Sequence, residues 1–466
     1  MSLLSQLCPF TFGCNVFTLG IIFTLLFLLL DFMKRRKPCT DFPPSPPSWP
    51  FVCNLLQMDF RDLNNGFKQI SLSKQYGDVM SLQVFWKSMV VLNGFEVIKE
   101  ALIQKSEDTA DRPPFNLYEI LGFVGNNKGV LLANYGQSWK DLRRFTLSTL
   151  KDFGMGKKSL EERVGEEAGY LCDAFQSEQG RPFDPHVLIN TAVSNVICSI
   201  IFGERFEYDD HKFQKLLCLI EEEIINEHKQ TWDSGHTRDF IDAFMLEMEK
   251  AKGVKDSNFN DQNLLLTIAE LFVAGTETTT TTLRWGLLFM LLYPDVQRKV
   301  REEIDRVIGR TRKPTMGDVL QMPYTNAVIH EIQRYGDIIP LSMPHMAYRD
   351  THIKSFFIPK GTVIMTNLSS VLKDEKVWEK PFQFYPEHFL DGDGKFVKRE
   401  AFMAFSAGRR VCLGEQLARM ELFLFFSSLL QRFSFQIPDG EPCPREDPVF
   451  AFFQVPHDHK ICAKAR

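Results

Sequence analysis

The order of apolar and polar residues separates an apolar beginning from a long, mostly helical remainder. Residues 10–33 are apolar apart from small polar residues and Asp31, and about 20 such residues in a helix span a bilayer. The basic run 34–37 follows at once, and no Lys or Arg precedes it. This predicts a single-pass transmembrane signal-anchor over residues 1–33, with the remainder in the cytosol. The alternative is a cleaved secretory signal, which requires a basic start and a small-residue cleavage site that the sequence lacks.

Five prolines between residues 43 and 50 form the next break in the pattern. Proline fixes the backbone dihedral φ and has no amide donor, so this stretch predicts a stiff, extended spacer. We therefore expect residues 34–50 to be a basic stop-transfer segment followed by a proline hinge, and residues 51–466 to form the globular domain.

Short alternating stretches predict a small sheet within this domain. Residues 79–84 and 89–92 alternate around Lys87-Ser88 and predict a hairpin. Residues 353–357 and 362–367 flank a Pro-Lys-Gly sequence and predict a second strand pair. Nearly everything between has helical periodicity. The expected fold class is therefore mainly α with a small β subdomain.

Composition narrows the functional classes. The 466 residues are 44% hydrophobic and include 42 phenylalanines, which is enough for a large core or for the walls of an apolar cavity. The net charge of -5 gives no basic footprint and argues against nucleic acid as a partner. The 10 cysteines lack metal-binding spacing and are expected to be reduced thiols. Because no Gly-x-Gly-x-x-Gly unit follows a strand, electrons for redox chemistry would arrive from another protein.

One decapeptide, residues 405–414, carries the most specific chemical signal. Its Cys412 lies just before a helix predicted for residues 415–433, where backbone N–H groups and the helix dipole favour a thiolate. Two glycines let the backbone bend and approach a flat group, and Arg410 offers a cation. A lone thiolate does not suit zinc or an iron–sulfur cluster, but it suits haem. The alternative for an arbitrary cysteine is a small buried hydrophobe.

This loop resembles the haem-binding loop of the haem-thiolate monooxygenases, the cytochrome P450 family, at every defining position: Phe405, Gly408, Arg410, Cys412 and Gly414. Residues 206–210, 370–375 and 418–423 are similar to vertebrate microsomal family 2, nearest its 2D subfamily. The resemblance covers essentially the whole chain. It implies the cytochrome P450 fold, an endoplasmic-reticulum membrane location, and one haem b (iron protoporphyrin IX) with the Cys412 thiolate as its metal ligand. Residues 51–466 would then be the haem-binding catalytic domain.

The resemblance also implies a reaction and its partners. One oxygen atom of dioxygen would be inserted into small lipophilic substrates such as drugs and other xenobiotics, with amines, fatty acids and steroids as further classes. Electrons would pass from NADPH through NADPH–cytochrome P450 reductase, with cytochrome b5 as a further partner. The cations expected on the docking face are Lys140, Arg143, Arg144 and Arg432, although plain solvated charges are the alternative.

A long helix predicted for residues 261–293 carries a second motif. Gly275 and five consecutive threonines, 278–282, lower its helix propensity by about 1 kcal/mol and by a few tenths of a kcal/mol each. We expect Gly275 to leave room over the flat cofactor, and a threonine hydroxyl to replace a backbone hydrogen bond and open a polar groove for dioxygen. The segment resembles the family's oxygen-activation motif, which implies Thr278 as the catalytic alcohol and Glu277 as the acid. Without the cysteine loop, the threonines would indicate only unusual packing.

Further roles are implied by the resemblance alone. Contacts to the haem propionates are implied for Trp139, Arg143, Arg112 and His345. Walls of the substrate cavity, each equally suited to plain core, are implied for Phe115, Phe123, Leu131, Ala274, Ile338, Ile339, Leu341, Phe450 and Phe452.

Three polar positions are also matched to the family. Glu270 matches an acid that holds cationic amines, and a satisfied or solvated acid is the alternative. Glu331 and Arg334 match a structural pair beneath the haem loop, in which His388 stands where an arginine is usual. A histidine can hydrogen-bond there, but its charge depends on pH.

One region departs from the family pattern. Between residues 210 and 231 only one short helix fits, about 211–229, whereas family members have two helices and a loop that roof the substrate cavity. A cavity open on the membrane side is therefore expected. This leaves an alternative function, a haem-binding but catalytically impaired variant. A membrane-anchored scaffold without haem is a further alternative.

Overall fold

The computed structural model describes residues 9–35, 41–47, 54, 72–84, 87–114, 129–208, 221–254, 257–450 and 453–466. Helices dominate, as the sequence predicts. They are α1 (Pro9–Arg35), α3 (Phe95–Lys99), α5 (Gln137–Asp152), α6 (Lys158–Ser177), α7 (His186–Ile201), α9 (Glu221–Thr231), α10 (Phe240–Lys250), α11 (Asp261–Leu292), α12 (Pro294–Val307), α13 (Pro323–Gly336), α14 (Ser369–Leu372) and α15 (Glu415–Arg432). Short 3-10 turns cover Met316–Gln321, Pro386–Phe389 and Gly408–Arg410, and Glu100–Gln104 is a π-helical turn.

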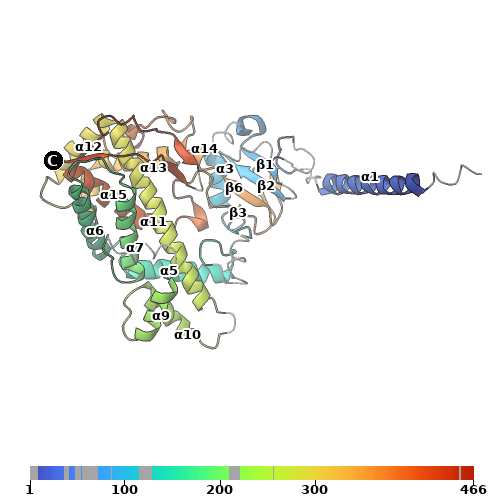
Figure 1. Cartoon of the computed structure of the whole chain (residues 1–466), viewed down its shortest axis with the longest axis horizontal. Coiled ribbons are helices and arrows are strands. Elements are labelled where there is room, and N and C mark those ends of the chain that lie inside the picture. Colours follow the sequence, from blue (N-terminus) through green and yellow to red (C-terminus); the bar gives the residue numbers. More distant parts are fainter. Residues whose placement is uncertain are drawn as a thin grey trace, which may run out of the picture.

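The long helix α11 crosses the helical part of the molecule and packs on α7 and α15 (Figure 1). Its bounds confirm the helix predicted for 261–293, and the following Pro294 begins α12. A Cβ added at Gly275 would come within 2.5 Å of Ile197 on α7. The prediction that Gly275 leaves room over a cofactor is therefore wrong, because its missing side chain instead lets α7 and α11 pack closely.

A small sheet lies between the helical part and α1 (Figure 1). Its strand order is β1 (Val79–Val84), β2 (Lys87–Leu92), β6 (Val363–Thr366) and β3 (His345–Met346). The antiparallel pairing of β1 and β2 confirms the first predicted hairpin, but Lys87 and Ser88 belong to β2 rather than to the turn.

The second predicted strand pair is wrong. Residues 356–358 form β5 (Phe356–Ile358), which pairs with β4 (Thr351–Ile353), while β6 lies parallel to β2. The chain reverses at Lys354, which has a φ of 53°, rather than at the Pro-Lys-Gly sequence. The remaining strands form two further pairs, β7 (Phe433–Gln436) with β10 (Cys462–Ala465) and β8 (Pro448–Phe450) with β9 (Gln454–Pro456).

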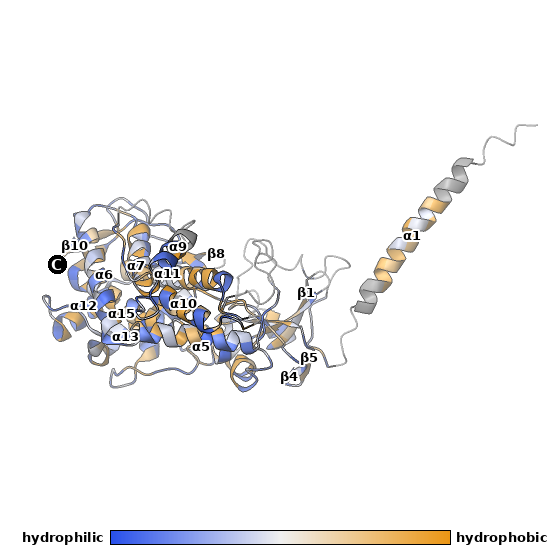
Figure 2. Ribbon diagram, turned by 90° about the horizontal axis from the view of Figure 1, so that it is seen from below, coloured by the Kyte–Doolittle hydropathy of each residue, from blue (hydrophilic) through white to orange (hydrophobic). Residues whose placement is uncertain are grey.

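The apolar helix α1 stands clear of the rest of the chain in both views (Figures 1 and 2). Among its described side chains, Phe17 and Phe23 are 73% and 70% exposed. No helix in the described part of the chain is both long and apolar enough to cross a membrane. The predicted membrane span is therefore not confirmed.

The region predicted to be short contains α9, which begins at Glu221; residues 211–220 of the predicted helix lie outside the described residues. Helix α9 is tied to α10 by His228, whose Nε2 lies 2.7 Å from Oδ2 of Asp239. Nearby, Asp242 receives both arms of the Arg238 guanidinium at 2.6 and 2.8 Å. These partners hold the turn between the two helices.

Candidate haem and oxygen-activation site

The cysteine loop is folded tightly against the π-helical turn. Its Gly408 has a φ of 73°, and a Cβ there would lie 1.7 Å from the carbonyl oxygen of Leu102. Only glycine fits this position. The backbone N–H of Cys412 donates to the carbonyl of Phe405 at 3.0 Å, which closes the loop just before α15 begins at Glu415.

The Cys412 side chain is exposed, although protein surrounds its sulfur. Burial raises the pKa of this thiol above its usual value, and the N–H of Gly414 and the charge of Arg143 oppose the rise. The start of α15 lowers the pKa of the thiol, as predicted, but burial raises it more. Without a bound metal, the net pKa of Cys412 therefore lies above its usual value. A thiol is deprotonated outright when it coordinates a metal.

Arg410 is buried in a ring of backbone carbonyl groups. Its guanidinium donates to the carbonyls of Ala110 at 2.8 Å, Ala133 at 2.5 Å and Val130 at 3.2 Å. These acceptors are neutral, so the positive charge is held in place without being cancelled.

Two further guanidinium groups have the same kind of surroundings. Arg112 donates to the carbonyls of Pro344 at 2.7 Å and Leu131 at 3.2 Å. Arg143, on α5, donates to the carbonyl of Val411 at 2.6 Å, next to the cysteine. None of the three arginines forms an ion pair with a carboxylate of the described residues. We call Arg112, Arg143 and Arg410 the guanidinium cluster.

Trp139 lies between two members of this cluster. The guanidinium carbons of Arg410 and Arg143 are 4.2 and 5.6 Å from the centre of its ring, which is cation–π distance. The indole N–H donates to the carbonyl of Val130 at 3.0 Å. Trp139 and Arg143 share one face of α5, as their spacing predicts, and the tryptophan supports the cluster through its ring.

The guanidinium cluster gathers like charges in a buried place, and the carboxylates of Asp111 and Glu270 offset them only in part. Burial and the charge of Arg112 lower the pKa of Arg410 to about 8. Burial and the charge of Arg143 lower the pKa of Arg112 to about 10. Burial also depresses the pKa of His345, whose Nδ1–H donates to the carbonyl of Thr109 at 2.8 Å, so its imidazole is neutral. Arginine keeps its proton in proteins, so an anion bound beside the cluster would stabilise these buried charges.

These residues fit a haem group. The cluster offers cations for propionates, and Cys412 offers its sulfur as one soft axial ligand. Ser406 supplies independent evidence, because its buried hydroxyl has no hydrogen-bond partner among the described residues. Sequence reasoning missed Ser406; its φ of 60° and its buried hydroxyl become visible only in the folded loop.

The predicted oxygen-activation segment lies in an unbroken helix. The hydroxyl of Thr278 donates to the carbonyl of Ala274 at 2.7 Å, one turn earlier. Glu277 accepts a hydrogen bond of 3.3 Å from the hydroxyl of Thr281. Thr278 and Ala274 share a helix face with Glu270, since these residues are four apart. Ala274 is exposed and Thr278 half-buried, so this face of α11 is open.

Glu270 holds the chain that leads from Gly129 into the guanidinium cluster. Its Oε2 accepts backbone N–H groups of Val130 at 2.7 Å and Leu131 at 3.0 Å. A side chain at Gly129, whose φ is 61°, would collide with this carboxylate. The structure therefore shows a structural use for Glu270, in line with the satisfied acid that was the alternative to amine binding.

Glu331 and Arg334 form a fully buried pair on α13. Both nitrogens of the Arg334 fork donate to Glu331 at 2.7 Å. Arg334 also donates to the carbonyls of Leu372, Pro381 and Gln383 at 2.8 to 2.9 Å. The chain thus closes around one guanidinium.

His388 completes this pair where an arginine was usual. Its Nε2 accepts the backbone N–H of Lys380 at 3.1 Å, so its Nδ1 carries the proton and faces both oxygens of Glu331 at 3.3 Å. A neutral histidine therefore satisfies the site.

The predicted cavity residues are placed only in part. Phe115, Phe123 and Phe452 lie outside the described residues, and Phe450 belongs to β8 although its side chain is not described. Ile338 accepts the N–H of Gln454 through its carbonyl at 2.9 Å, which brings residues 338–341 to the β8–β9 hairpin. Ile338 and Ile339 are half-buried, Leu341 is 9% exposed and Leu131 is 36% exposed.

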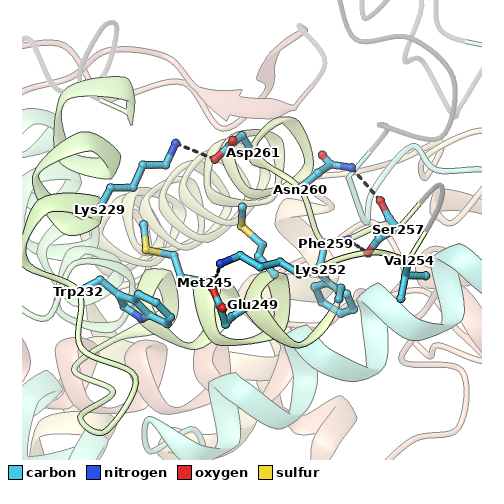
Figure 3. A pocket seen from close by; sticks show the side chains of 12 residues that line it. Lys229, Trp232, Met245, Glu249, Lys252, Val254, Ser257, Phe259, Asn260 and Asp261 are labelled. Carbon is cyan, nitrogen blue, oxygen red and sulfur yellow. Dashed lines mark hydrogen bonds and ion pairs between the residues drawn. The ribbon is translucent and has the colours of Figure 1, made fainter.

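A pocket of about 540 Å³ lies elsewhere, between α9, α10 and the start of α11 (Figure 3). Trp232, Met245 and Phe259 line it, and an ion pair of 2.7 Å between Lys229 and Asp261 lies at one side. None of the predicted substrate residues lines this pocket. It is not the predicted substrate site.

Comparison with known proteins decides the family. The sequence pattern described as Cytochrome P450 matches residues 43–223 and 219–463. This chain belongs to the cytochrome P450 family. It is 51% identical to cytochrome P450 2D6 of Homo sapiens over 491 aligned residues, which cover 96% of this chain and 98% of the relative. It is also 51% identical to cytochrome P450 2D15 of Canis lupus familiaris over 497 aligned residues, covering 97% and 99%.

These matches make the chain a 2D-like member of P450 family 2 and a monooxygenase, whose haem is held by a cysteine thiolate. P450 enzymes of this kind act on lipophilic substrates with a redox partner and are microsomal. The comparisons therefore give no support to an impaired variant.

The comparisons also bear on the shortened region. The aligned lengths of 491 and 497 exceed the 466 residues of this chain, so the relatives contain residues without a counterpart here. The two matched segments meet at residues 219–223, inside the region predicted to be short.

Proposed function

We propose that this P450 holds haem b through the sulfur of Cys412 and through the guanidinium cluster, and oxidises small lipophilic xenobiotics at the open face of α11. The observation that carries this proposal is a set of three arginines beside the cysteine loop, Arg112 and Arg410 buried and Arg143 half-buried, whose guanidinium groups donate only to carbonyls among the described residues. A dicarboxylate cofactor with one open axial position matches that arrangement.

Bound haem would supply the activation of dioxygen with electrons delivered from outside. The chain's own part is to hold the sulfur, bind the propionates and manage protons. Thr278 has its hydroxyl on the open face of α11, where it would be free to hold and pass on a proton once it leaves the carbonyl of Ala274. Glu277 lies one residue away with Thr281 as its partner and serves as the acid that restores the proton.

A coupling assay tests the roles of these two residues. In membranes that contain the enzyme and NADPH–cytochrome P450 reductase, Thr278→Ala should lower product formed per NADPH by about tenfold and raise hydrogen peroxide release. The matched control is Thr282→Ala, because the Thr282 hydroxyl bonds to the carbonyl of Thr278 at 2.8 Å in the same way one turn later. Equal coupling in the two variants would contradict a special role for Thr278.

The electron donor is proposed to be NADPH–cytochrome P450 reductase, with cytochrome b5 as a second donor. The exposed cations Arg144 and Lys140, on the same helix as Arg143, support a docking face on the cysteine side, whereas Arg432 lies at the far end of α15 from Cys412 and is not part of this face. Reduction rates should fall as salt rises, since exposed charges are screened. Rates that do not change between low and high salt would remove this proposal.

Cationic amines are the proposed substrate class. Glu270 brings a carboxylate to the face that also carries Ala274 and Thr278, and opposite charges attract in a partly dry site. Glu270→Gln should raise KM for an amine by about tenfold and leave KM for a neutral substrate of similar size unchanged. An equal loss for both substrates would mean that Glu270 acts only by holding Val130 and Leu131.

Attachment to the endoplasmic-reticulum membrane is proposed to run through α1. The exposed apolar side chains at residues 16–30 support this, and basic residues 34–37 follow them. Removing residues 1–33 should move the protein from the pelleted membrane fraction toward the soluble fraction. An unchanged pellet after a high-salt wash would contradict an anchor in this segment.

A further inference from the structure

A buried carboxyl group joins the two helices that carry the proposed catalytic residues. Glu421 lies on α15, which begins directly after the cysteine loop, and it is 1% exposed. The hydroxyl of Thr279, on α11, donates to its Oε2 at 3.2 Å. Its other oxygen, Oε1, has no hydrogen-bond partner in the part of the chain that the structure describes. Both helices appear side by side in Figure 1.

This carboxyl group is unusual in its surroundings. Burial raises the pKa of Glu421 to about 8, and the hydroxyl of Thr279 opposes the rise. No charged side chain of the described residues contributes to the shift, and burial thus favours the neutral acid over the carboxylate near pH 7. An apolar side chain would pack here without the cost of burying a half-satisfied polar group. A local violation of this kind is typical of a functional position.

The hydrogen bond between Thr279 and Glu421 lies next to Thr278, the proposed catalytic alcohol. Thr279 follows Thr278 directly, so a bond from Thr279 to α15 fixes both the rotation and the height of α11 at this point. The same helix α15 that carries Glu421 begins three residues after Cys412, so it connects this hydrogen bond to the cysteine loop. The next hydroxyl, that of Thr280, instead approaches Oδ1 of Asn190 on α7 at 3.4 Å. Successive threonines thus tie α11 to different neighbours.

We infer that Glu421 is a positioning residue for oxygen activation: its buried carboxyl group ties α15 to α11 at Thr279 and so sets where the Thr278 hydroxyl lies relative to the Cys412 sulfur. This inference rests on the proposed function. Misplacing a reacting group by about 1 Å can cost up to 10²-fold in rate, so a lost link would first impair the use of bound oxygen. The two electrons of NADPH would then leave as hydrogen peroxide instead of reaching product.

Coupling measurements on the haem-loaded enzyme with its reductase test the inference. Thr279→Val keeps the side-chain volume and removes the donor, and it should lower product per NADPH about three- to tenfold with KM unchanged. Thr279→Ser keeps the hydroxyl and should restore coupling. Glu421→Leu should behave like Thr279→Val, whereas Glu421→Gln, which keeps an acceptor, should stay near the wild type. If Glu421→Leu does not fold, Thr279→Val and Thr279→Ser decide.

Thr280→Val is the matched control, because it removes a neighbouring hydroxyl that points to α7. Equal coupling in Thr279→Val and Thr280→Val would overturn the inference. The reduced carbon monoxide spectrum separates this result from a failure of the proposed function. A wild type without the thiolate band would refute the haem assignment, whereas a normal band with unchanged coupling in Thr279→Val would refute only the role of Glu421.

Discussion

Two buried arginine sites in this P450 have opposite electrostatic character. Arg334 is 0% exposed and donates to both oxygens of Glu331 through its fork, with three carbonyls around the rest of the group. Arg410 is also buried, but its hydrogen-bond partners are carbonyls, and the like charges of Arg112 and Arg143 act on it against the opposite charges of Asp111 and Glu270. The first site pairs its cation directly with a carboxylate of the chain, whereas no carboxylate of the described residues forms an ion pair with Arg410.

This difference separates a structural site from a ligand site. A buried ion pair with a full set of hydrogen bonds needs nothing further, and its charges are not available to a cofactor. A buried cation with neutral acceptors is held in position, yet it gains free energy when an anion arrives. A buried arginine can therefore be structural or ligand-binding, and its hydrogen-bond partners indicate which role it has.

The largest expected effect is the loss of stability when Arg334 is removed from its buried ion pair with Glu331. Arg334→Met leaves Glu331 buried without a cation, which costs about 3–5 kcal/mol of unfolding free energy. Denaturant midpoints of haem-free and haem-loaded protein should both fall. Arg298→Met is the control, because Arg298 is 51% exposed in its pairs with Asp295 and Glu302, and it should cost less than about 1 kcal/mol. Similar losses in the two variants would contradict the comparison.

Glu421 extends the comparison to a buried acid that has no cation at all. Its pKa is raised to about 8 when folded, so the folded state binds a proton that the unfolded chain releases above its ordinary pKa near 4.5. Stability therefore falls as pH rises between about 5 and 8, by up to a few kcal/mol. Melting temperatures should show this slope in the wild type and a weaker slope in Glu421→Gln. Parallel slopes would mean that Glu421 is ionised in the folded protein.

Removing a member of the guanidinium cluster should act on the cofactor more than on the fold. Arg410→Met should speed the transfer of haem to an acceptor protein about tenfold, or roughly 1.4 kcal/mol. The haem-free protein should lose less stability than Arg334→Met does, because the lost hydrogen bonds are offset by relief of repulsion with Arg112. Unchanged haem transfer with strongly reduced stability would place Arg410 among the structural arginines.

The smallest effect is expected at His388. Its Nδ1 faces Glu331 at 3.3 Å, at the long end for a hydrogen bond, while Arg334 binds the same carboxylate at 2.7 Å. His388→Gln should cost about 1 kcal/mol and leave the spectrum unchanged. A loss as large as that of Arg334→Met, measured by the same denaturation, would show that the histidine carries more of this site than its geometry indicates.

Sequence patterns predicted the strongly periodic elements and the cysteine loop. The long helix α11 and the helix after Cys412 end within one residue of their predicted limits, because an apolar period and a following proline or turn fix them locally. The pairing of β6 with β2 was missed, since it joins strands far apart in the chain. The role of Gly275 depends on its contact with Ile197, which is distant in the sequence, and the role of Ser406 depends on the burial of its hydroxyl. Neither can be predicted from the local sequence pattern.

The central claim is that the Cys412 sulfur and the guanidinium cluster together form the haem site. Its most direct test is the reduced carbon monoxide difference spectrum of the purified wild type and of Cys412→Ser. We expect the wild type to show the band of a thiolate-ligated haem and the serine variant to lose it, with or without retention of pigment. A thiolate band that survives in Cys412→Ser would contradict the account.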